Sequence, residues 1–216
     1  MNSSTSKSPS TSISRPGTEA LHPSLRTAII AGMQLRPARI EDIPSIMDLE
    51  RIPEYHTFVG HWPEDEHRTK MAGTDCRYLI AESESGEMAG FAILRGLAAP
   101  HRSIRLQRIV VAKPNCGVGR LMLAAILDYV FGELKAHRLW LDVFETNTRA
   151  HHVYASLGFR REGILREAVF RDGEYHTQLL MSILDREYAV PRRSPKEAAA
   201  DREGESSPAS PRRGTA

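Results

Sequence analysis

Residues 104–127 constrain the fold most, because they place an apolar strand, a glycine-containing loop and an apolar helix in direct succession. The first part, residues 104–111, alternates and then becomes fully apolar, which predicts a strand that is buried at its end. The loop contains Gly117 and Gly119, and residues 121–127 predict the body of a helix. A helix that starts directly after such a loop presents free backbone N–H groups, so the segment predicts an anion-binding turn.

The anion at this turn is not expected to be a nucleoside triphosphate or a dinucleotide. The loop lacks the Gly-Lys-Ser/Thr of a Walker loop, and no Gly-x-Gly-x-x-Gly can be read in it. Gly117 and Gly119 carry no Cβ, so the backbone can approach a phosphate closely at both positions. Taken alone, a Gly-x-Gly pair also fits an ordinary turn.

A second helix is predicted after the apolar strand of residues 139–144. Asn147 is suited to the N-cap of this helix, and Gly158 is suited to its C-terminal end. Ala150 and Tyr154 lie four residues apart and therefore share one helix face. A tyrosine hydroxyl held there can give a proton to a group bound beside the strand. An ordinary amphipathic helix with a buried tyrosine is the alternative interpretation.

Together, these two segments resemble the GNAT superfamily of acyl-CoA-dependent N-acetyltransferases. The spacing Asn-x-x-Ala-x-x-x-Tyr-x-x-x-Gly-Phe in residues 147–159 is similar to the family's CoA-binding and catalytic helix. Gly117-x-Gly119 matches the second half of the family's pyrophosphate loop, whereas Pro114 stands where Gln or Arg is usual. The resemblance covers about residues 33–188. It implies an α/β fold with a single mixed central sheet and flanking helices, and acetyl-CoA as cosubstrate.

The resemblance also implies a set of site residues. Backbone N–H groups at the end of the predicted strand, beside a bulge, would stabilise the oxyanion that forms when an amine attacks the thioester. Tyr154 would be the general acid for the CoA thiolate, because its ordinary pKa of about 10 lies above that of a thiol, about 8.5. The residues expected to contact the cosubstrate are Ile109, Val110, Val111, Cys116, Gly117, Val118, Gly119, Arg120, Asn147 and Ala150.

The general base is not assigned by the sequence. An alkylamine with a pKa of about 10 is mostly protonated at neutral pH and has to lose a proton before it attacks. The strand of residues 104–111 carries no acidic residue that would match the glutamate of many relatives. Candidates near the acceptor cleft are Glu50, Glu54, His56, His61 and Glu145. Each is equally explained as a solvated surface group, and a chain of water molecules is a further alternative.

The acceptor is narrowed to a primary amine. Residues 161–175 look similar to the closing hairpin of the branch that includes spermidine and ribosomal-protein N-terminal acetyltransferases. A polyamine acceptor would require a ring of carboxylates, part of which Glu50, Glu54, Glu64 and Glu66 can supply. A protein N-terminus would require an open groove. The sequence leaves both acceptors open.

Composition limits the other function classes. A formal net charge of +2 with 26% charged residues does not favour nucleic acid as a partner, although a tRNA-acetylating, toxin-like enzyme stays an alternative. A catalytically silent acyl-CoA-binding module is the second alternative to an amine acetyltransferase. No apolar run approaches the length of a membrane-spanning helix. With Cys76 and Cys116 as the only cysteines and no zinc-ligand spacing, we expect a cytoplasmic protein without a metal, and dimers are common in this fold.

Three regions are expected along the chain. Residues 1–32 are rich in Ser, Thr and Pro, and residues 190–216 in Pro, Ser, Ala and mixed charge. Neither segment shows apolar periodicity, which predicts disorder, and residues 33–189 are expected to form the N-acetyltransferase domain. Met33 directly precedes the first predicted strand, which favours a translation start there over a transit peptide. Asp172-Gly173 is the strongest hairpin signal. Predicted strands cover residues 34–37, 77–82, 88–97, 104–111, 139–144, 166–171 and 174–183, and further helices cover residues 41–51 and 54–71, the latter interrupted at 60–63.

Overall fold

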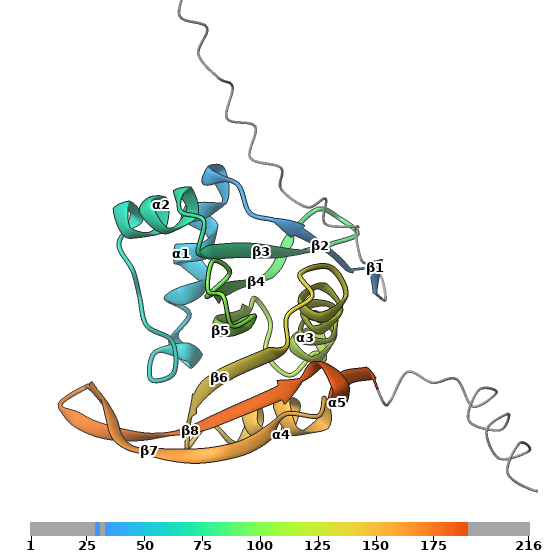
Figure 1. The fold of residues 1–216 in the computed structure, drawn as a ribbon. Coiled ribbons are helices and arrows are strands. Elements are labelled where there is room, and N and C mark those ends of the chain that lie inside the picture. Colours follow the sequence, from blue (N-terminus) through green and yellow to red (C-terminus); the bar gives the residue numbers. More distant parts are fainter. Residues whose placement is uncertain (1–28, 31–32, 190–216) are drawn as a thin grey trace, which may run out of the picture.

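The central feature of the computed structural model, which describes residues 29–30 and 33–189, is an eight-stranded mixed sheet (Figure 1). The sheet order is β1-β2-β3-β4-β5-β6-β8-β7, and all neighbours pair antiparallel except β5 and β6. The predicted mixed α/β fold is therefore confirmed. The strands are β1 Ile29–Ile30, β2 Met33–Pro37, β3 Cys76–Ser83, β4 Met88–Arg95, β5 Ser103–Val111, β6 Arg138–Phe144, β7 Arg160–Arg171 and β8 Glu174–Leu184.

Helices pack on both faces of the sheet and bury two separate apolar clusters. On one face, α3 and Tyr154 of α4 pack against the larger cluster, which includes Leu106 and Leu141. On the other face, α1 packs against the smaller cluster around Phe91 and Val110. The helices are α1 Ile43–Glu50, α2 Glu64–Ala72, α3 Val118–Leu127, α4 Thr148–Ser156 and α5 Asp185–Ala189, with short 3₁₀ turns at Ile40–Asp42 and Pro53–Tyr55 and a π-helical turn at Asp128–Glu133 that continues α3.

Strands β5 and β6 pair over a short length only. Their parallel register covers Ser103, Ile104 and Arg105 of β5, and β6 then diverges from the rest of that strand. Both strands keep a full antiparallel partner on their outer side, namely β4 for β5 and β8 for β6. Beyond these three residues, the facing edges of β5 and β6 are not paired with each other, so the sheet is open in its middle.

A register shift in β5 changes which face its side chains reach. The β4–β5 pairing runs from Ile93↔Arg108 directly to Leu94↔Leu106, so Gln107 is an extra residue in β5. The predicted bulge is therefore present, but it lies at Gln107, before the Ile109–Val111 end where it was expected. An extra residue of this kind bends a strand and increases its twist, which agrees with the departure of β6 at this point.

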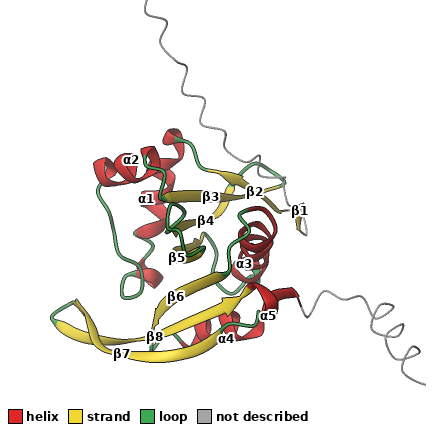
Figure 2. Ribbon diagram, in the orientation of Figure 1, coloured by secondary structure: helices red, strands yellow, loops and turns green. Residues whose placement is uncertain are grey.

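The turn between β7 and β8 has the conformation that its sequence predicted. Asp172 and Gly173 join β7 to β8 and have φ values of 52° and 84°, the left-handed pair that a two-residue hairpin turn requires. Segment 51–63, which connects α1 to α2, is mostly loop and approaches the tip of this hairpin (Figure 2). In the part of the chain that the structure describes, no helix is long and apolar enough to cross a membrane.

One predicted boundary needs correction. Residues 29–30 form β1 and pair with β2, although the sequence predicted disorder up to residue 32. The remainder of the predicted N-terminal extension and the predicted tail at 190–216 lie outside the described residues. Strand β7 is also longer than expected: it starts at Arg160 rather than at residue 166 and carries two register shifts against β8.

Candidate active site

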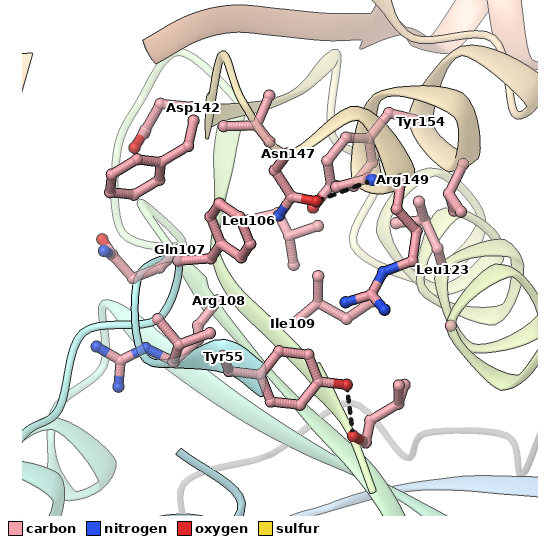
Figure 3. A pocket seen from close by; sticks show the side chains of 18 of the residues that line it. Tyr55, Leu106, Gln107, Arg108, Ile109, Leu123, Asp142, Asn147, Arg149 and Tyr154 are labelled. Carbon is pink, nitrogen blue, oxygen red and sulfur yellow. Dashed lines mark hydrogen bonds between the residues drawn. The ribbon is translucent and has the colours of Figure 1, made fainter. Parts of the chain in front are cut away.

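A cavity of about 700 Å³ lies where β5 and β6 diverge. Its walls come from β5 and β6, the turn before α3, the first turns of α4, segment 51–63 and the β7–β8 hairpin. Figure 3 shows Tyr154, Asn147 and Arg149 on one side of this space and Tyr55 with Arg108 on the other. The site is thus assembled from segments that are up to 123 residues apart in the sequence, from Tyr55 to Gln178.

The turn before α3 has the backbone conformation of an anion cradle. Gly117 is the N-cap of α3 and has φ 77°, and Asn115 also lies in the left-handed region with φ 64°. The backbone N–H groups of Val118 and Gly119 precede the first helical hydrogen bonds and have no acceptor within the helix. A Cβ on Gly119 would stand 3.7 Å from Val111 Cγ1, so glycine keeps the floor of the turn open. These features fit a diphosphate.

The inner edge of β5 directs alternate backbone groups into the cavity. Tyr55 donates a hydrogen bond to the carbonyl of Val111 at 2.8 Å, whereas the Ala112 N–H donates to Ala89 at 2.8 Å on the β4 side. Because backbone groups alternate in direction along a strand, the N–H groups of Val111 and Ile109 face away from β4 and toward the cavity. The N–H of Val110 faces β4.

Most of the predicted cosubstrate residues line this cavity, but three do not. The Val110 side chain is 1% exposed in the smaller apolar cluster. Cys116 is exposed and its thiol faces the Pro114 carbonyl, 3.5 Å away, and Val118 packs against the larger apolar cluster. The predicted residues that line the cavity are Ile109, Val111, Gly117, Gly119, Arg120, Asn147, Ala150 and Tyr154. Their contacts with the cosubstrate stay predictions.

Tyr154 is buried and its hydroxyl is available to a ligand. The residue is 8% exposed, its ring packs against Phe159 with centroids 5.6 Å apart, and it lines the cavity. The hydroxyl makes no hydrogen bond to any residue in the described part of the chain. Burial, assisted by the negative charge of Asp142, raises the pKa of Tyr154 above its ordinary value of 10. The phenol therefore stays protonated at neutral pH.

Asn147 holds the start of α4, as the sequence predicted. Its side-chain oxygen accepts a hydrogen bond from the Ala150 N–H at 3.2 Å, which confirms the N-cap. The cap fixes the first turn of the helix, and Tyr154 follows one turn later on the same face. Only the side-chain oxygen of Asn147 takes part in the cap, so its side-chain N–H groups can donate to a ligand.

Several arginines of the cavity were not identified from the sequence. Arg149 extends across the space, 6.0 Å from the Tyr55 ring centroid and 3.5 Å from the Asn115 side-chain oxygen. Arg105 forms an ion pair with Asp142, the one carboxylate among the described lining residues. Of these arginines, only Arg149 could have been identified from the sequence, because it lies in the first turn of the helix that carries Tyr154.

None of the five predicted base candidates lines the cavity within the described chain. Glu50 is 1% exposed, forms an ion pair with Arg108 and accepts a hydrogen bond from the Trp62 N–H at 3.3 Å. His56 is exposed, 3.5 Å from the Asp172 carboxylate. The remaining candidates are exposed to solvent and lie outside the cavity lining, namely Glu54, His61 and Glu145.

The four carboxylates that could supply part of a ring for a polyamine do not line this cavity in the described chain. Glu64 is paired with Arg68 at 2.6 Å and Glu66 with Lys70 at 3.1 Å, both on the outer surface of α2. Glu50 is neutralised by Arg108, and Glu54 is exposed outside the cavity lining. The expectation rested on their positions in segment 50–66, which lies close to the cavity but turns these carboxylates away from it.

Comparisons with known proteins identify the family of this chain. The acetyltransferase (GNAT) family matches residues 43–159, which is more than half of the chain. The chain is 28% identical over 174 residues to spermidine N(1)-acetyltransferase of Escherichia coli, covering 76% of this chain and 91% of that protein. It is 33% identical over 114 residues to the Vibrio cholerae spermidine N(1)-acetyltransferase, covering 52% and 65%.

A solved structure is similar over most of this chain. The crystal structure of spermidine N-acetyltransferase from Vibrio cholerae in complex with CoA and spermine has a TM-score of 0.68 and 25% identity, and the match covers 74% of this chain and 99% of that chain. The match of family and fold confirms the resemblance predicted from the sequence. The chain belongs to the acetyltransferase (GNAT) family and is an acetyl-CoA-dependent N-acetyltransferase.

Proposed function

We propose that the chain transfers the acetyl group of acetyl-CoA directly to a primary amine, with Tyr154 as the general acid. The observation that carries the proposal is the position of the Tyr154 hydroxyl, which is protonated and lines the cavity between the α3 turn and the open edge of β5. A phenol that makes no hydrogen bond within the described chain is free to donate to a leaving group.

The cosubstrate is held by the turn before α3 and by two arginines. The free N–H groups of the turn and the positive end of the α3 dipole favour a diphosphate. Arg120 and Arg149 line the same part of the cavity, and no carboxylate in the described residues neutralises either of them. Acetyl-CoA supplies a thioester, whose carbonyl carbon is the electrophile for the amine.

The open edge of β5 stabilises the negative charge that develops in the reaction. When the amine attacks the thioester, the carbonyl oxygen becomes an oxyanion in a tetrahedral intermediate. The N–H groups of Ile109 and Val111 face the cavity and are candidates to donate to this oxygen. Tyr55 keeps this edge in place, because its hydroxyl holds the Val111 carbonyl at 2.8 Å.

Tyr154 then protonates the departing sulfur. Its raised pKa exceeds that of a thiol by more than the roughly 1.5 units between the ordinary values, so a complete transfer is uphill in free energy. The benefit comes while charge accumulates on the sulfur, when a positioned donor stabilises it most. Asp142 is paired with Arg105, so we propose that the amine loses its proton to water rather than to a side chain.

Replacing Tyr154 by phenylalanine tests this assignment. Loss of a positioned acid should lower kcat by about 10- to 1,000-fold and leave the acetyl-CoA dissociation constant nearly unchanged. Thiol release measures turnover, and calorimetry measures binding. Tyr129→Phe is a matched control, because the Tyr129 hydroxyl is buried without a hydrogen-bond partner in the described chain and does not line the cavity. Full turnover in Tyr154→Phe would remove this residue from the mechanism.

The acceptor panel for this assay should include polyamines first, because the relatives named above are spermidine acetyltransferases. Amino acids, aminoglycosides and peptides with free N-termini complete it. Binding of acetyl-CoA without thiol release for any amine would instead support the catalytically silent module. A homodimer stays a prediction from the family resemblance.

A further inference from the structure

Arginines outnumber carboxylates in the lining of the cavity. Two of them, Arg108 and Arg171, lie at what we call the acceptor end, the part between segment 51–63 and the β7–β8 hairpin, which Gly60, Trp62, Phe144 and Gln178 also line. Five arginines line the whole cavity, against one carboxylate in the described chain. A cavity built to receive a multiply charged cation would carry the opposite balance, since like charges that approach in a partly dry site repel each other.

Two of these arginines are neutralised by the protein. Arg105 is paired with Asp142, and Arg108 is paired with the buried Glu50. Two others, Arg120 and Arg149, lie beside the α3 turn, where the phosphates of the cosubstrate account for them. Arg171 is the remaining arginine, and it lies at the acceptor end, away from the turn.

Arg171 is fixed in place but lacks a counter-charge. One guanidinium nitrogen, Nη1, donates to the Thr57 carbonyl at 2.6 Å, and the group lies 5.3 Å from the Phe144 ring centroid. Glu174 is the cross-strand neighbour of Arg171 in the hairpin, yet the two form no ion pair. Across the described residues, no carboxylate comes within ion-pair distance of this guanidinium.

The free edge of Arg171 has the shape of a carboxylate receptor. With Nη1 bound to Thr57, the Nε and Nη2 donors have no acceptor in the described chain, and this edge matches the two oxygens of a carboxylate. The Nη2 atoms of Arg171 and Arg108 each lie 3.4 Å from the point where a Cβ of Gly60 would stand. Gly60 therefore leaves room for a ligand group where the two guanidinium groups converge.

We infer that the acceptor carries a carboxylate near its reactive amine and that Arg171 binds this carboxylate. The acceptor class is then an amino acid or another amine with a carboxylate, rather than a polyamine. This inference rests on the proposed function and narrows its acceptor. Arg171 is a specificity-determining residue in this reading, because its charge and planar donor edge select one class of amine over another.

Matched acceptor pairs test the inference. Each amino acid is compared with its own carboxamide in the thiol-release assay, with spermidine as the cationic acceptor. The amine of the carboxamide is less basic, so more of it is neutral at pH 7.5 and its chemical reactivity opposes the expected preference. We expect kcat/KM for the amino acid to exceed that for the carboxamide and for spermidine by about 10- to 100-fold, the range for a hydrogen-bonded charge pair.

Variants of Arg171 assign this preference to one side chain. Arg171→Met should lower kcat/KM for the amino acid by about 10- to 100-fold and leave the value for the carboxamide within about threefold. Arg171→Glu should reverse the order and favour spermidine, a change that a purely structural role would not produce. Arg166→Met is the matched control, because Arg166 is exposed on the same strand and does not line the cavity.

The outcomes separate this inference from the proposed function. If spermidine or the carboxamides are the better acceptors of the wild-type protein, or if Arg171→Met keeps the preference for amino acids, the inference is overturned and acetyl transfer stands. If acetyl-CoA binds but no amine releases thiol, both are overturned. Calorimetry in the presence of CoA adds a readout without turnover: the amino acid should bind more tightly than its carboxamide, and Arg171→Met should abolish the difference.

Discussion

Replacing Glu50 by glutamine separates a structural role of this residue from a catalytic one. Glu50 is 1% exposed, and its carboxylate is paired with Arg108, whose side chain is 7% exposed. Glutamine has the same shape and retains an oxygen that can accept from the Trp62 N–H. The substitution therefore removes one buried charge and leaves the guanidinium of Arg108 without its partner.

The expected loss of stability is large. Removal of one partner of a buried ion pair costs about 3–5 kcal/mol, because the other charge stays buried and uncompensated. Arg108 also lines the cavity and lies 4.1 Å from the Trp62 ring centroid, so water and the aromatic face recover part of the cost. We take the lower end, about 3 kcal/mol, which corresponds to a melting temperature about 6–12 °C lower for a chain of this size.

Thermal melting followed by circular dichroism measures this change. Glu64→Gln is the matched control, because the Glu64 side chain is 52% exposed in its ion pair with Arg68 and such pairs contribute less than about 1 kcal/mol. A Glu50→Gln protein that melts within about 2 °C of wild type would refute the buried-pair argument. If kcat fell more than tenfold in that stable protein and its pH profile lost a limb, Glu50 would be the general base after all.

Three further predictions concern the turn, the strand edge and pH. Gly119→Val places a branched side chain beside Val111 Cγ1 and should raise the acetyl-CoA dissociation constant at least about tenfold by calorimetry, so an unaltered value would contradict the diphosphate assignment. Tyr55→Phe leaves the Val111 carbonyl without its donor and should cost about 1 kcal/mol, or about 2–4 °C in melting temperature; no change would mean that water replaces the hydroxyl. Arg138 and Ser182 lower the pKa of Glu162 from 4.5 to about 2. Because the folded-state pKa is the lower one, this carboxylate stabilises the fold above about pH 4.5 and the contribution is lost as pH falls toward 2. Glu162→Gln should therefore melt slightly below wild type at pH 7 and equally at pH 2, and a gap that persists at pH 2 would contradict the assignment.

The parts of the fold that sequence analysis predicted correctly depend on local chemistry. Asn147 caps α4 because its side chain reaches a backbone N–H three residues later, and Asp172-Gly173 turns because both residues tolerate positive φ. The glycine loop leads directly into α3, with Gly117 as the N-cap of that helix. In each case the residues that determine the conformation are close together in the chain, so the local sequence is enough to predict it.

The Val110 side chain does not line the cavity, and the sequence already contained the reason. Adjacent residues of a strand send their side chains to opposite faces and their backbone groups to opposite edges. Ile109 and Val111 line the cavity, so Val110 between them has to face the smaller apolar cluster and strand β4. The prediction that residues 109–111 all contact the cosubstrate ignored this alternation along the strand.

The charges of the cavity could not be predicted, because each depends on a partner far along the chain. Arg108 and Glu50 are 58 positions apart, and Arg171 and Thr57 are 114 apart. In the sequence, Glu50 is one carboxylate in a chain with 26% charged residues and has no mark of burial. Only the fold shows that Arg108 is paired with Glu50 while Arg171 has no carboxylate partner among the described residues, and the acceptor proposed above rests on this difference.

The short pairing of β5 with β6 explains how a sheet of this kind can afford an opening at its centre. Each strand keeps one complete ladder, on β4 or on β8, so divergence exposes only the inner edges. Arg105, the last paired residue of β5, reaches Asp142 of β6 and lies 5.1 Å from the Trp140 ring centroid, and these contacts hold the strands together where their hydrogen bonds end. The freed N–H groups beyond that point are unsatisfied by other strands, and buried backbone donors require an acceptor. We propose that carbonyl oxygens of the bound cosubstrate accept hydrogen bonds from these N–H groups.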